Sequence, residues 1–325
     1  MDEKKSPLIV LTGPTAVGKT RLSIDLARAV GGEIVSADSM QVYRHMNIGS
    51  AKITREQMQG IPHHMIDILD PRESFNVAMF QEKSRECLAQ IYGRGHIPVV
   101  TGGTGFYIQA LLKNVDFSGE EGLDREKEEP GAYRKYLEAL AEEKGPDYLH
   151  SLLCQADPVS AKAIHANNIK RTIRALEFYH LTGQRISEHN RQEKQKTSVY
   201  NSCYFVLNDE RDRLYSRIEQ RVEEMLAEGL VEEVKALKRM GCHKGMVSMQ
   251  GLGYKEILAW LEGECTYEQA VEVLKRDTRH FAKRQLTWFR REREVIWVEK
   301  NMFDYDDEKI LEFMLEKLWE RGIVS

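Results

Sequence analysis

The residues best suited to chemistry lie near the start of the chain, in the segment Gly13-Pro14-Thr15-Ala16-Val17-Gly18-Lys19-Thr20. This segment matches the phosphate-loop pattern GxxxxGK[ST], and it lies between an apolar run at 8–11 and a helical pattern at 19–30. Glycine lets backbone N–H groups converge on phosphate oxygens, and the helix N-terminus adds partial positive charge. We therefore predict that the loop binds a di- or triphosphate, such as ATP, that Lys19 contacts a terminal phosphate and that Thr20 ligates Mg²⁺.

A phosphate loop alone does not name a reaction, so the position of the nearest acid matters. Kinases and hydrolases usually add a strand that ends in Asp. Here the apolar run 97–100 leads into Thr101-Gly102-Gly103-Thr104-Gly105, which contains no acid. The nearest candidate is Asp38, after a predicted strand at 33–37. Because ligands bind at the carboxyl ends of parallel strands, Asp38 is expected to face the phosphate loop; capping the next segment is the alternative role.

Three arginines recur every four residues on a predicted helix over 212–239. They are Arg213, Arg217 and Arg221. Like charges at this spacing oppose each other. Asp209 could pair with Arg213, and Glu224 with Arg221, but no acid lies at a helical neighbour position of Arg217. We therefore predict that Arg217 and Arg221 bind the diphosphate; a solvated Arg217 is the alternative.

The elements that would position these residues alternate between strands and helices. Strands are predicted at 8–11, 33–37, 97–101, 203–207 and 295–298, and helices at 19–30, 80–92, 212–239 and 267–293. This alternation favours an α/β fold with a parallel sheet flanked by helices, similar to P-loop NTPases. Between them the patterns are helical alone, at 132–143, 146–155 and 168–181. We predict a core formed by 1–116 and 199–325, with an all-helical insertion at 117–198.

Composition excludes several classes of protein. The 325 residues include 47 Lys and Arg against 51 Asp and Glu, for a net charge of −4, so a uniformly basic nucleic-acid coat is excluded but a local basic face is not. No apolar stretch suits a membrane span, and the start lacks the apolar region of a signal peptide. The five cysteines form no CxxC pair, which argues against a zinc site. We expect a cytoplasmic monomer.

Basic side chains gather on one stripe of the predicted helix at 267–293, which we call the basic stripe. It consists of Arg276, His280, Lys283, Thr287 and Arg290, is free of acids, and is widened by Arg284. A basic row beside aromatic anchors is typical of contact with a nucleic-acid backbone, although a solvated helix face is the common alternative. For His63 and His64 we favour structural roles over metal binding.

Taken together, these motifs resemble the tRNA dimethylallyltransferase family, also called tRNA isopentenyl transferases. The resemblance is carried, in the family's order, by residues 13–20, 36–43 (SADSMQVY), 63–67 (HHMID), 102–107 (GGTGFY), 171–177 (RTIRALE) and 282–290 (AKRQLTWFR). Members transfer a dimethylallyl group from dimethylallyl diphosphate to N6 of the adenine on the 3′ side of the tRNA anticodon, and release diphosphate. Two departures are Ala166, where the family often has proline, and the divergent stretch 118–130.

The resemblance and the chemistry together suggest roles for particular residues. Asp38 would take the proton from N6, and Thr104 would hydrogen-bond the reacting centre. Further tRNA contacts are expected from residues beside Asp38, on the insertion and on the glycine-rich segment 248–254: Ser39, Met40, Gln41, Lys127, Lys170, Arg171, Arg174 and Gly251. Two alternatives remain, a P-loop small-molecule kinase, which leaves the basic stripe without a role, and a non-catalytic RNA-binding module, which leaves Asp38 without one.

Overall fold

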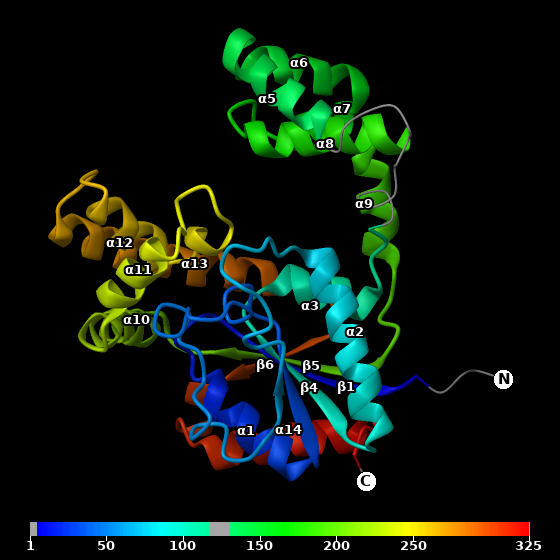
Figure 1. Cartoon of the computed structure of the whole chain (residues 1–325). Helices are drawn as coiled ribbons and strands as arrows, with labels where there is room; N and C mark the ends of the chain where they lie inside the picture. Colours follow the sequence, from blue (N-terminus) through cyan, green and yellow to red (C-terminus); the bar gives the residue numbers. More distant parts are fainter. Residues whose placement is uncertain (1–4, 118–130, 325) are drawn as a thin grey trace. The chain divides into compact units, whose positions relative to one another are not determined.

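In the computed structural model, which describes residues 5–117 and 131–324, six parallel strands form one sheet in the order β3-β2-β4-β1-β5-β6 (Figure 1). The strands are β1 (Pro7–Thr12), β2 (Gly32–Ser36), β3 (His63–His64), β4 (Ile97–Gly102), β5 (Asn201–Asn208) and β6 (Val295–Glu299). Ile9 in β1 pairs with Val99 of β4 and Cys203 of β5, so β1 is central. The α/β prediction is confirmed, and β3 is a strand that the sequence did not predict.

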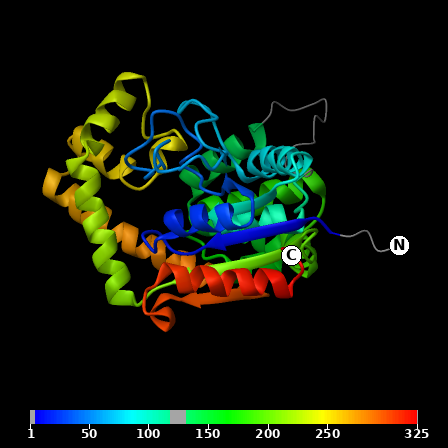
Figure 2. The same cartoon turned by 90° about the horizontal axis from the view of Figure 1, so that it is seen from below.

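Helices cover both faces of this sheet, which is why its strands are continuous apolar runs (Figure 2). On one face lie α1 (Lys19–Ala29) and α14 (Asp307–Glu320), and on the other lie α2 (Val77–Gly93) and α3 (Gly105–Lys113). Leu22 and Leu26 of α1 share a buried core with Met314 of α14 and Phe205 of β5. Burying each such side chain stabilises the fold by roughly 1.5–3 kcal/mol.

The chain between β5 and β6 differs from its prediction. It contains α10 (Arg211–Ala227), α11 (Leu230–Arg239), the short helix η1 (Ser248–Gln250), α12 (Tyr254–Leu261) and α13 (Tyr267–Phe289). The single helix predicted over 212–239 is wrong, because Gly229 adopts φ 105° and separates α10 from α11. Glycine takes this left-handed conformation without steric cost. After β6, the short helix η2 (Lys300–Phe303) leads to α14.

Two compact units divide the chain, Met1–Leu112 with Ser198–Ser325 and, separately, Lys113–Thr197. The sequence placed these boundaries at 116–117 and 198–199. The second unit contains α5 (Ala132–Lys144), α6 (Pro146–Ala156), α7 (Pro158–Ala163), α8 (Ile169–Thr182) and α9 (Ile186–Gln195). Its core is built around Leu137, Leu149 and Ile173. Within the described ranges, none of the helices combines the length and apolar character that crossing a bilayer requires.

Candidate functional site

A cavity of about 1020 Å³ lies where β1, β2 and β4 end, at the carboxyl edge of the sheet. It is lined by most of the residues that the sequence singled out in the core: Thr15, Ala16, Gly18, Lys19, Thr20, Asp38, Ser39, Met40, Gln41, Thr104, Arg217, Arg221, Gly251 and Arg284. Gly13, Pro14 and Val17 complete the loop from buried positions behind this lining. Segments that lie far apart in the sequence therefore line the same cavity.

The phosphate loop needs glycine at two positions. Gly13 has φ 151°, and a Cβ there would lie 2.4 Å from the carbonyl oxygen of Leu207. Gly18, at the N-terminus of α1, has φ 100°. The ammonium of Lys19 folds back and donates to the carbonyl oxygens of Gly13, at 3.0 Å, and Pro14, at 2.8 Å. Burial, with repulsion from Arg221 as a smaller cause, lowers the pKa of Lys19 to about 7, and Asp38 opposes the shift.

The carboxylate of Asp38 is oriented by its own turn. Its Oδ1 accepts the backbone N–H groups of Met40, at 2.8 Å, and Gln41, at 3.3 Å. These bonds resemble those of a helix cap, but no helix follows. Within the described ranges, Oδ2 accepts no hydrogen bond, so one oxygen remains available at the cavity. Thr104 lies nearby, because its backbone N–H donates to the carbonyl of Ala37 at 3.3 Å.

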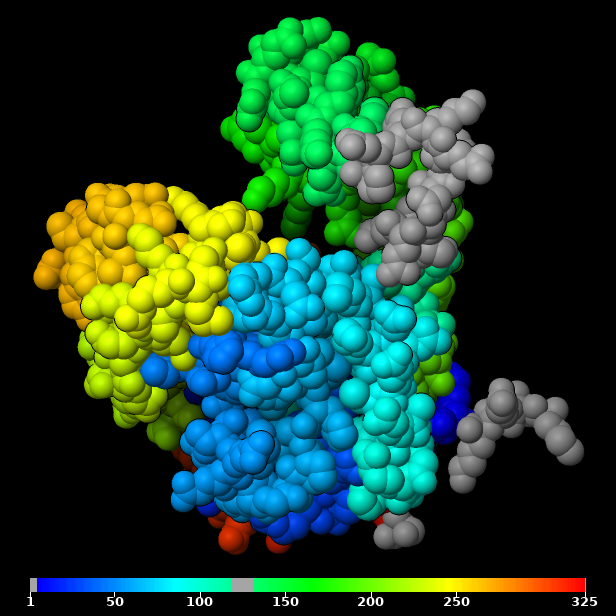
Figure 3. All heavy atoms as spheres, in the orientation of Figure 1, coloured from blue at the N-terminus to red at the C-terminus, as the bar shows by residue number. Residues whose placement is uncertain are grey.

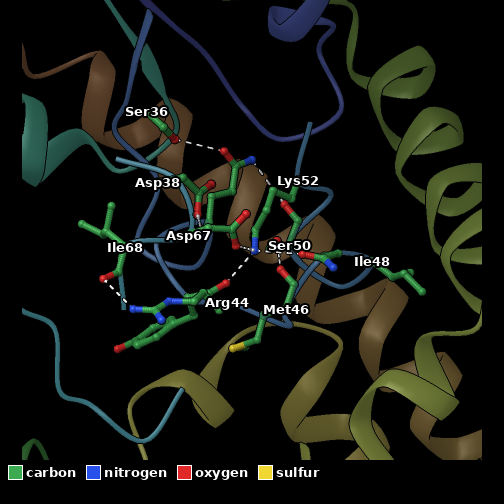
Figure 4. Close-up of polar contacts among 12 residues, drawn as sticks. Ser36, Asp38, Arg44, Met46, Ile48, Ser50, Lys52, Asp67 and Ile68 are labelled. Atoms are coloured by element: carbon green, nitrogen blue, oxygen red, sulfur yellow. Dashed lines mark hydrogen bonds and ion pairs between the residues drawn. The ribbon is translucent and has the colours of Figure 1, made fainter. Parts of the chain in front are cut away.

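A buried lysine holds the loop that follows Asp38. Lys52, whose side chain is 3% exposed, donates to the carbonyl of Tyr43 at 2.5 Å, to Oδ1 of Asn47 at 3.0 Å and to Oδ1 of Asp67 at 2.6 Å. Figure 4 shows its ammonium directed at Asp67. The backbone N–H of Asp67 in turn donates to the carbonyl of Gln41 at 3.1 Å. This network fixes the segment that carries Asp38, and the sequence analysis missed it.

The segment 248–254 forms a wall of the cavity. A Cβ on Gly251 would lie 2.7 Å from Sδ of Met40, so the two residues are in close contact. Ser248 donates to the carbonyl of Pro71 at 2.6 Å. In the space-filling view, the light-blue surface around residues 44–72 accordingly meets the yellow surface around 240–253 (Figure 3). The segment is therefore packed against the chain around Met40 and Pro71.

The arginines of α10 differ in their partners. Arg213 forms the predicted ion pair with Asp209, at 3.6 Å. Glu224 accepts a hydrogen bond from Gln220 at 2.8 Å, and its charge acts on Arg221 from a distance by raising the pKa of that residue. In the part of the chain that the structure describes, neither Arg217 nor Arg221 forms a hydrogen bond or an ion pair. Burial lowers the pKa of Arg221, and the negative charge of Asp38 opposes this shift.

Gln285 is a site residue that the sequence analysis did not single out. Its side chain is buried, and its Oε1 accepts the N–H of Thr15 at 2.9 Å while its Nε2 donates to the carbonyl of Gly103 at 2.9 Å. It thereby joins α13 to the phosphate loop and to the turn that carries Thr104. A glutamine within a helix gives no sign of such a bridge, because both partners lie more than a hundred residues away in the sequence.

The basic stripe of α13 is less continuous than predicted. Arg284 lines the main cavity, whereas Lys283, Thr287 and Arg290 line a second one of about 370 Å³. His280 is exposed and lines neither. The stripe itself contains no acid, but Arg276 at its start pairs with the neighbouring Asp277 at 3.0 Å.

The other candidates are distributed as follows. Lys170, Arg171 and Arg174 are exposed on α8 in the second unit, while Lys127 lies outside the described residues. Nε2 of His64 lies 2.6 Å from the buried carboxylate of Glu33, which is a structural contact. Among residues 5–117 and 131–324, no group of three or more His, Cys, Asp or Glu residues could hold a metal ion.

Comparisons with known proteins agree on one family. A family model described as IPP transferase matches residues 41–292, and one described as isopentenyl transferase matches residues 6–73. The chain is 56% identical over 320 residues to a tRNA dimethylallyltransferase of Lachnoclostridium phytofermentans, covering 98% of this chain and 99% of that protein.

Solved structures of similar proteins lead to the same family. A full-length tRNA isopentenylpyrophosphate transferase from Bacillus halodurans is 44% identical, with a TM-score of 0.71 and 98% of each chain covered. A tRNA isopentenylpyrophosphate transferase from Staphylococcus epidermidis is 40% identical, with a TM-score of 0.70 and coverage of 98% of this chain and 100% of that one. A eukaryotic dimethylallyltransferase acting on tRNA is 32% identical, with a TM-score of 0.76. The match covers 90% of this chain and 74% of that one.

Proposed function

The chain belongs to the tRNA dimethylallyltransferase family, and we propose on that premise that it transfers a dimethylallyl group from dimethylallyl diphosphate to tRNA. The acceptor is N6 of the adenine on the 3′ side of the anticodon, and diphosphate is released. One observation carries the proposal: the phosphate loop and Asp38 line a single cavity. One side of this cavity suits an anionic leaving group. The other side offers a carboxylate that can accept a proton from the attacking nucleophile.

The donor side suits the departure of a diphosphate. In this reaction the C–O bond of the donor breaks, so the diphosphate leaves intact and takes the bonding electron pair. The loop N–H groups and Lys19 would bind it, and Arg217 and Arg221 would balance the charge that develops on it. Because no phosphoryl group is transferred, the lack of an acid in the turn after β4 is consistent with this chemistry.

The acceptor side suits deprotonation of an amine. The N6 lone pair of adenine is delocalised into the ring, so N6 must lose a proton as its bond to carbon forms. The free Oδ2 of Asp38 is the group placed to accept that proton, which contributes a factor of roughly 10²–10⁴ in rate. The adenine must leave its stack to reach Asp38 in the cavity. Ser39, Met40, Gln41 and Gly251 would hold the extruded base, and Thr104 would hydrogen-bond the reacting centre.

Magnesium fits this site as a partner of the diphosphate. The Thr20 hydroxyl lines the cavity and, within the described ranges, forms no hydrogen bond. Mg²⁺ usually keeps several waters and binds through few protein groups plus substrate phosphates, so one hydroxyl in a cavity built for diphosphate is a suitable donor set. Bound there, Mg²⁺ would supply positive charge to the leaving group.

The basic residues outside the reaction centre would bind the tRNA backbone. On α13 and at its end these are Lys283, Arg284 and Arg290, with Arg276 and His280 nearer the N-terminus of the helix. On the insertion they are Lys170, Arg171 and Arg174, which would contact the anticodon loop. We expect the protein to act as a cytoplasmic monomer, which size-exclusion chromatography with light scattering would test.

Incubation of purified protein with labelled dimethylallyl diphosphate and unmodified tRNA tests the proposal. Label should enter RNA only when both substrates are present. The small-molecule kinase loses support, because relatives matched over nearly the whole chain are tRNA prenyltransferases. Phosphorylation of a metabolite by ATP without label in RNA would restore it, and tRNA binding without turnover would favour a non-catalytic RNA-binding protein.

A further inference from the structure

We propose that Lys300 is an additional diphosphate-binding residue, brought to the phosphate loop from the C-terminal part of the chain. This inference rests on the proposed function, since it extends the diphosphate site. Lys300 follows β6 directly and begins η2. Its side chain is only 7% exposed, although lysine is rarely buried without a specific partner.

The position of the Lys300 ammonium is defined by Gly18. A Cβ on Gly18 would lie 3.4 Å from Nζ of Lys300 and 3.3 Å from Nη2 of Arg217. Two cationic groups therefore converge on one glycine of the phosphate loop, where no side chain separates them from the backbone. Gly18 and Arg217 both line the main cavity.

The charges around Gly18 are not balanced by the protein alone. Among residues 5–117 and 131–324, Lys300 has one acidic partner, Asp307 of α14, at 3.3 Å, and Asp307 also lies 4.0 Å from Arg21. Arg217 has no ion pair within the described ranges. Like charges in a partly buried site repel, and the N-terminus of α1 adds to the positive potential. A ligand with several negative charges relieves this repulsion, and the diphosphate group is such a ligand.

A structural role for Lys300 is the alternative, since its ion pair with Asp307 connects the end of β6 to the start of α14. The two roles differ in what removal of Asp307 should do. If the ion pair matters only for folding, loss of either partner should have similar consequences. If Lys300 binds diphosphate, loss of Asp307 should leave the ammonium more available to the anion.

Calorimetric titration with inorganic pyrophosphate, together with thermal unfolding, separates these roles. We expect Lys300→Met to weaken pyrophosphate binding by about ten-fold or more, the range for losing a hydrogen bond to a charged group. Lys300→Arg should retain most of the affinity, and Asp307→Asn should bind at least as tightly as the wild type. The matched control is Lys309→Met, because Lys309 pairs with exposed Asp304 at 3.0 Å on the same stretch of chain.

Two outcomes would overturn the inference: wild-type pyrophosphate affinity in Lys300→Met, or equal losses of affinity in Lys300→Met and Asp307→Asn. Prenylation of tRNA by the wild-type protein is measured in the same series. A wild type that binds pyrophosphate but does not prenylate tRNA would contradict the proposed function, whereas an active wild type with an unaffected Lys300→Met variant would contradict the role of Lys300 alone.

Discussion

Gln285 in α13 accepts a hydrogen bond from the backbone N–H of Thr15 in the phosphate loop, at a distance of 2.9 Å. The same side chain donates to the carbonyl of Gly103, so one amide spans the donor side and the acceptor side of the cavity. The Gln285 side chain is buried, and it makes both bonds at the edge of the cavity. The spacing between the phosphate loop and the turn bearing Thr104 therefore depends on a residue of α13.

Replacement of Gln285 by leucine should remove this connection at similar volume. We expect kcat/KM for dimethylallyl diphosphate to fall by about ten-fold or more, and the free energy of unfolding by about 1–3 kcal/mol, because two partly buried backbone groups lose their partner. The matched control is Gln90→Leu, because Gln90 is exposed on α2 and does not line the cavity. Unchanged steady-state kinetics in Gln285→Leu would show that the bridge does not position the site.

Asp38→Asn preserves the shape of the side chain and removes the carboxylate that would act as the general base. Turnover should fall by roughly 10²–10⁴, the usual contribution of a positioned general base, while pyrophosphate affinity stays near that of the wild type. Single-turnover transfer to tRNA and pyrophosphate titration measure the two effects. Asp70→Asn is the control, because Asp70 pairs with Arg72 at a surface position outside the cavity. Near-normal turnover in Asp38→Asn would contradict the assignment.

Arg217→Gln tests the arginine that lines the cavity beside Gly18 of the phosphate loop. Loss of its charge should weaken pyrophosphate binding by about ten-fold or more and should leave tRNA binding largely unchanged. Arg28→Gln is the matched control, because Arg28 pairs with Asp25 on the outer side of α1. An unchanged pyrophosphate affinity would mean that Arg217 is simply solvated.

Lys19 should make diphosphate binding dependent on pH. In the free protein its pKa is lowered to about 7, so near neutral pH part of the population carries a neutral amine. An anion binds the protonated form better, which raises this pKa in the complex. Affinity for pyrophosphate should therefore fall as pH rises through about 7 and beyond, and binding should take up protons.

Calorimetry in buffers of different ionisation enthalpy measures that proton uptake, and Lys19→Met provides the reference for the ligand's own titration. Identical uptake in wild type and Lys19→Met would contradict the assignment of the effect to Lys19.

The phosphate loop and Asp38 were predictable because each follows a strand directly. A parallel sheet brings the carboxyl ends of its strands to one edge, so local motifs sufficed to expect that the two would meet. The Arg213–Asp209 ion pair was predictable for a similar reason, since helix spacing brings residues four apart together.

Other features depend on contacts between distant parts of the chain. Nothing in the neighbourhood of Lys52, Gln285 or Lys300 in the sequence distinguishes them from solvated polar residues. Arg279 lies among the basic residues of α13 in sequence, but Glu219 of α10 pairs with it at 2.5 Å once the two helices pack. The break at Gly229 was missed because the apolar periodicity continues across it in sequence, although the backbone there turns into the left-handed region.

The central claim is that the phosphate loop serves transfer of carbon to a nucleobase, and the most direct test combines two readouts in one reaction. Purified protein is incubated with dimethylallyl diphosphate, unmodified tRNA and ATP, the RNA is digested to nucleosides for mass spectrometry, and released diphosphate and remaining ATP are measured in parallel. We expect N6-dimethylallyladenosine and diphosphate in equal amounts without consumption of ATP. Unmodified adenosine in the RNA, with ATP consumed to phosphorylate another acceptor, would contradict it.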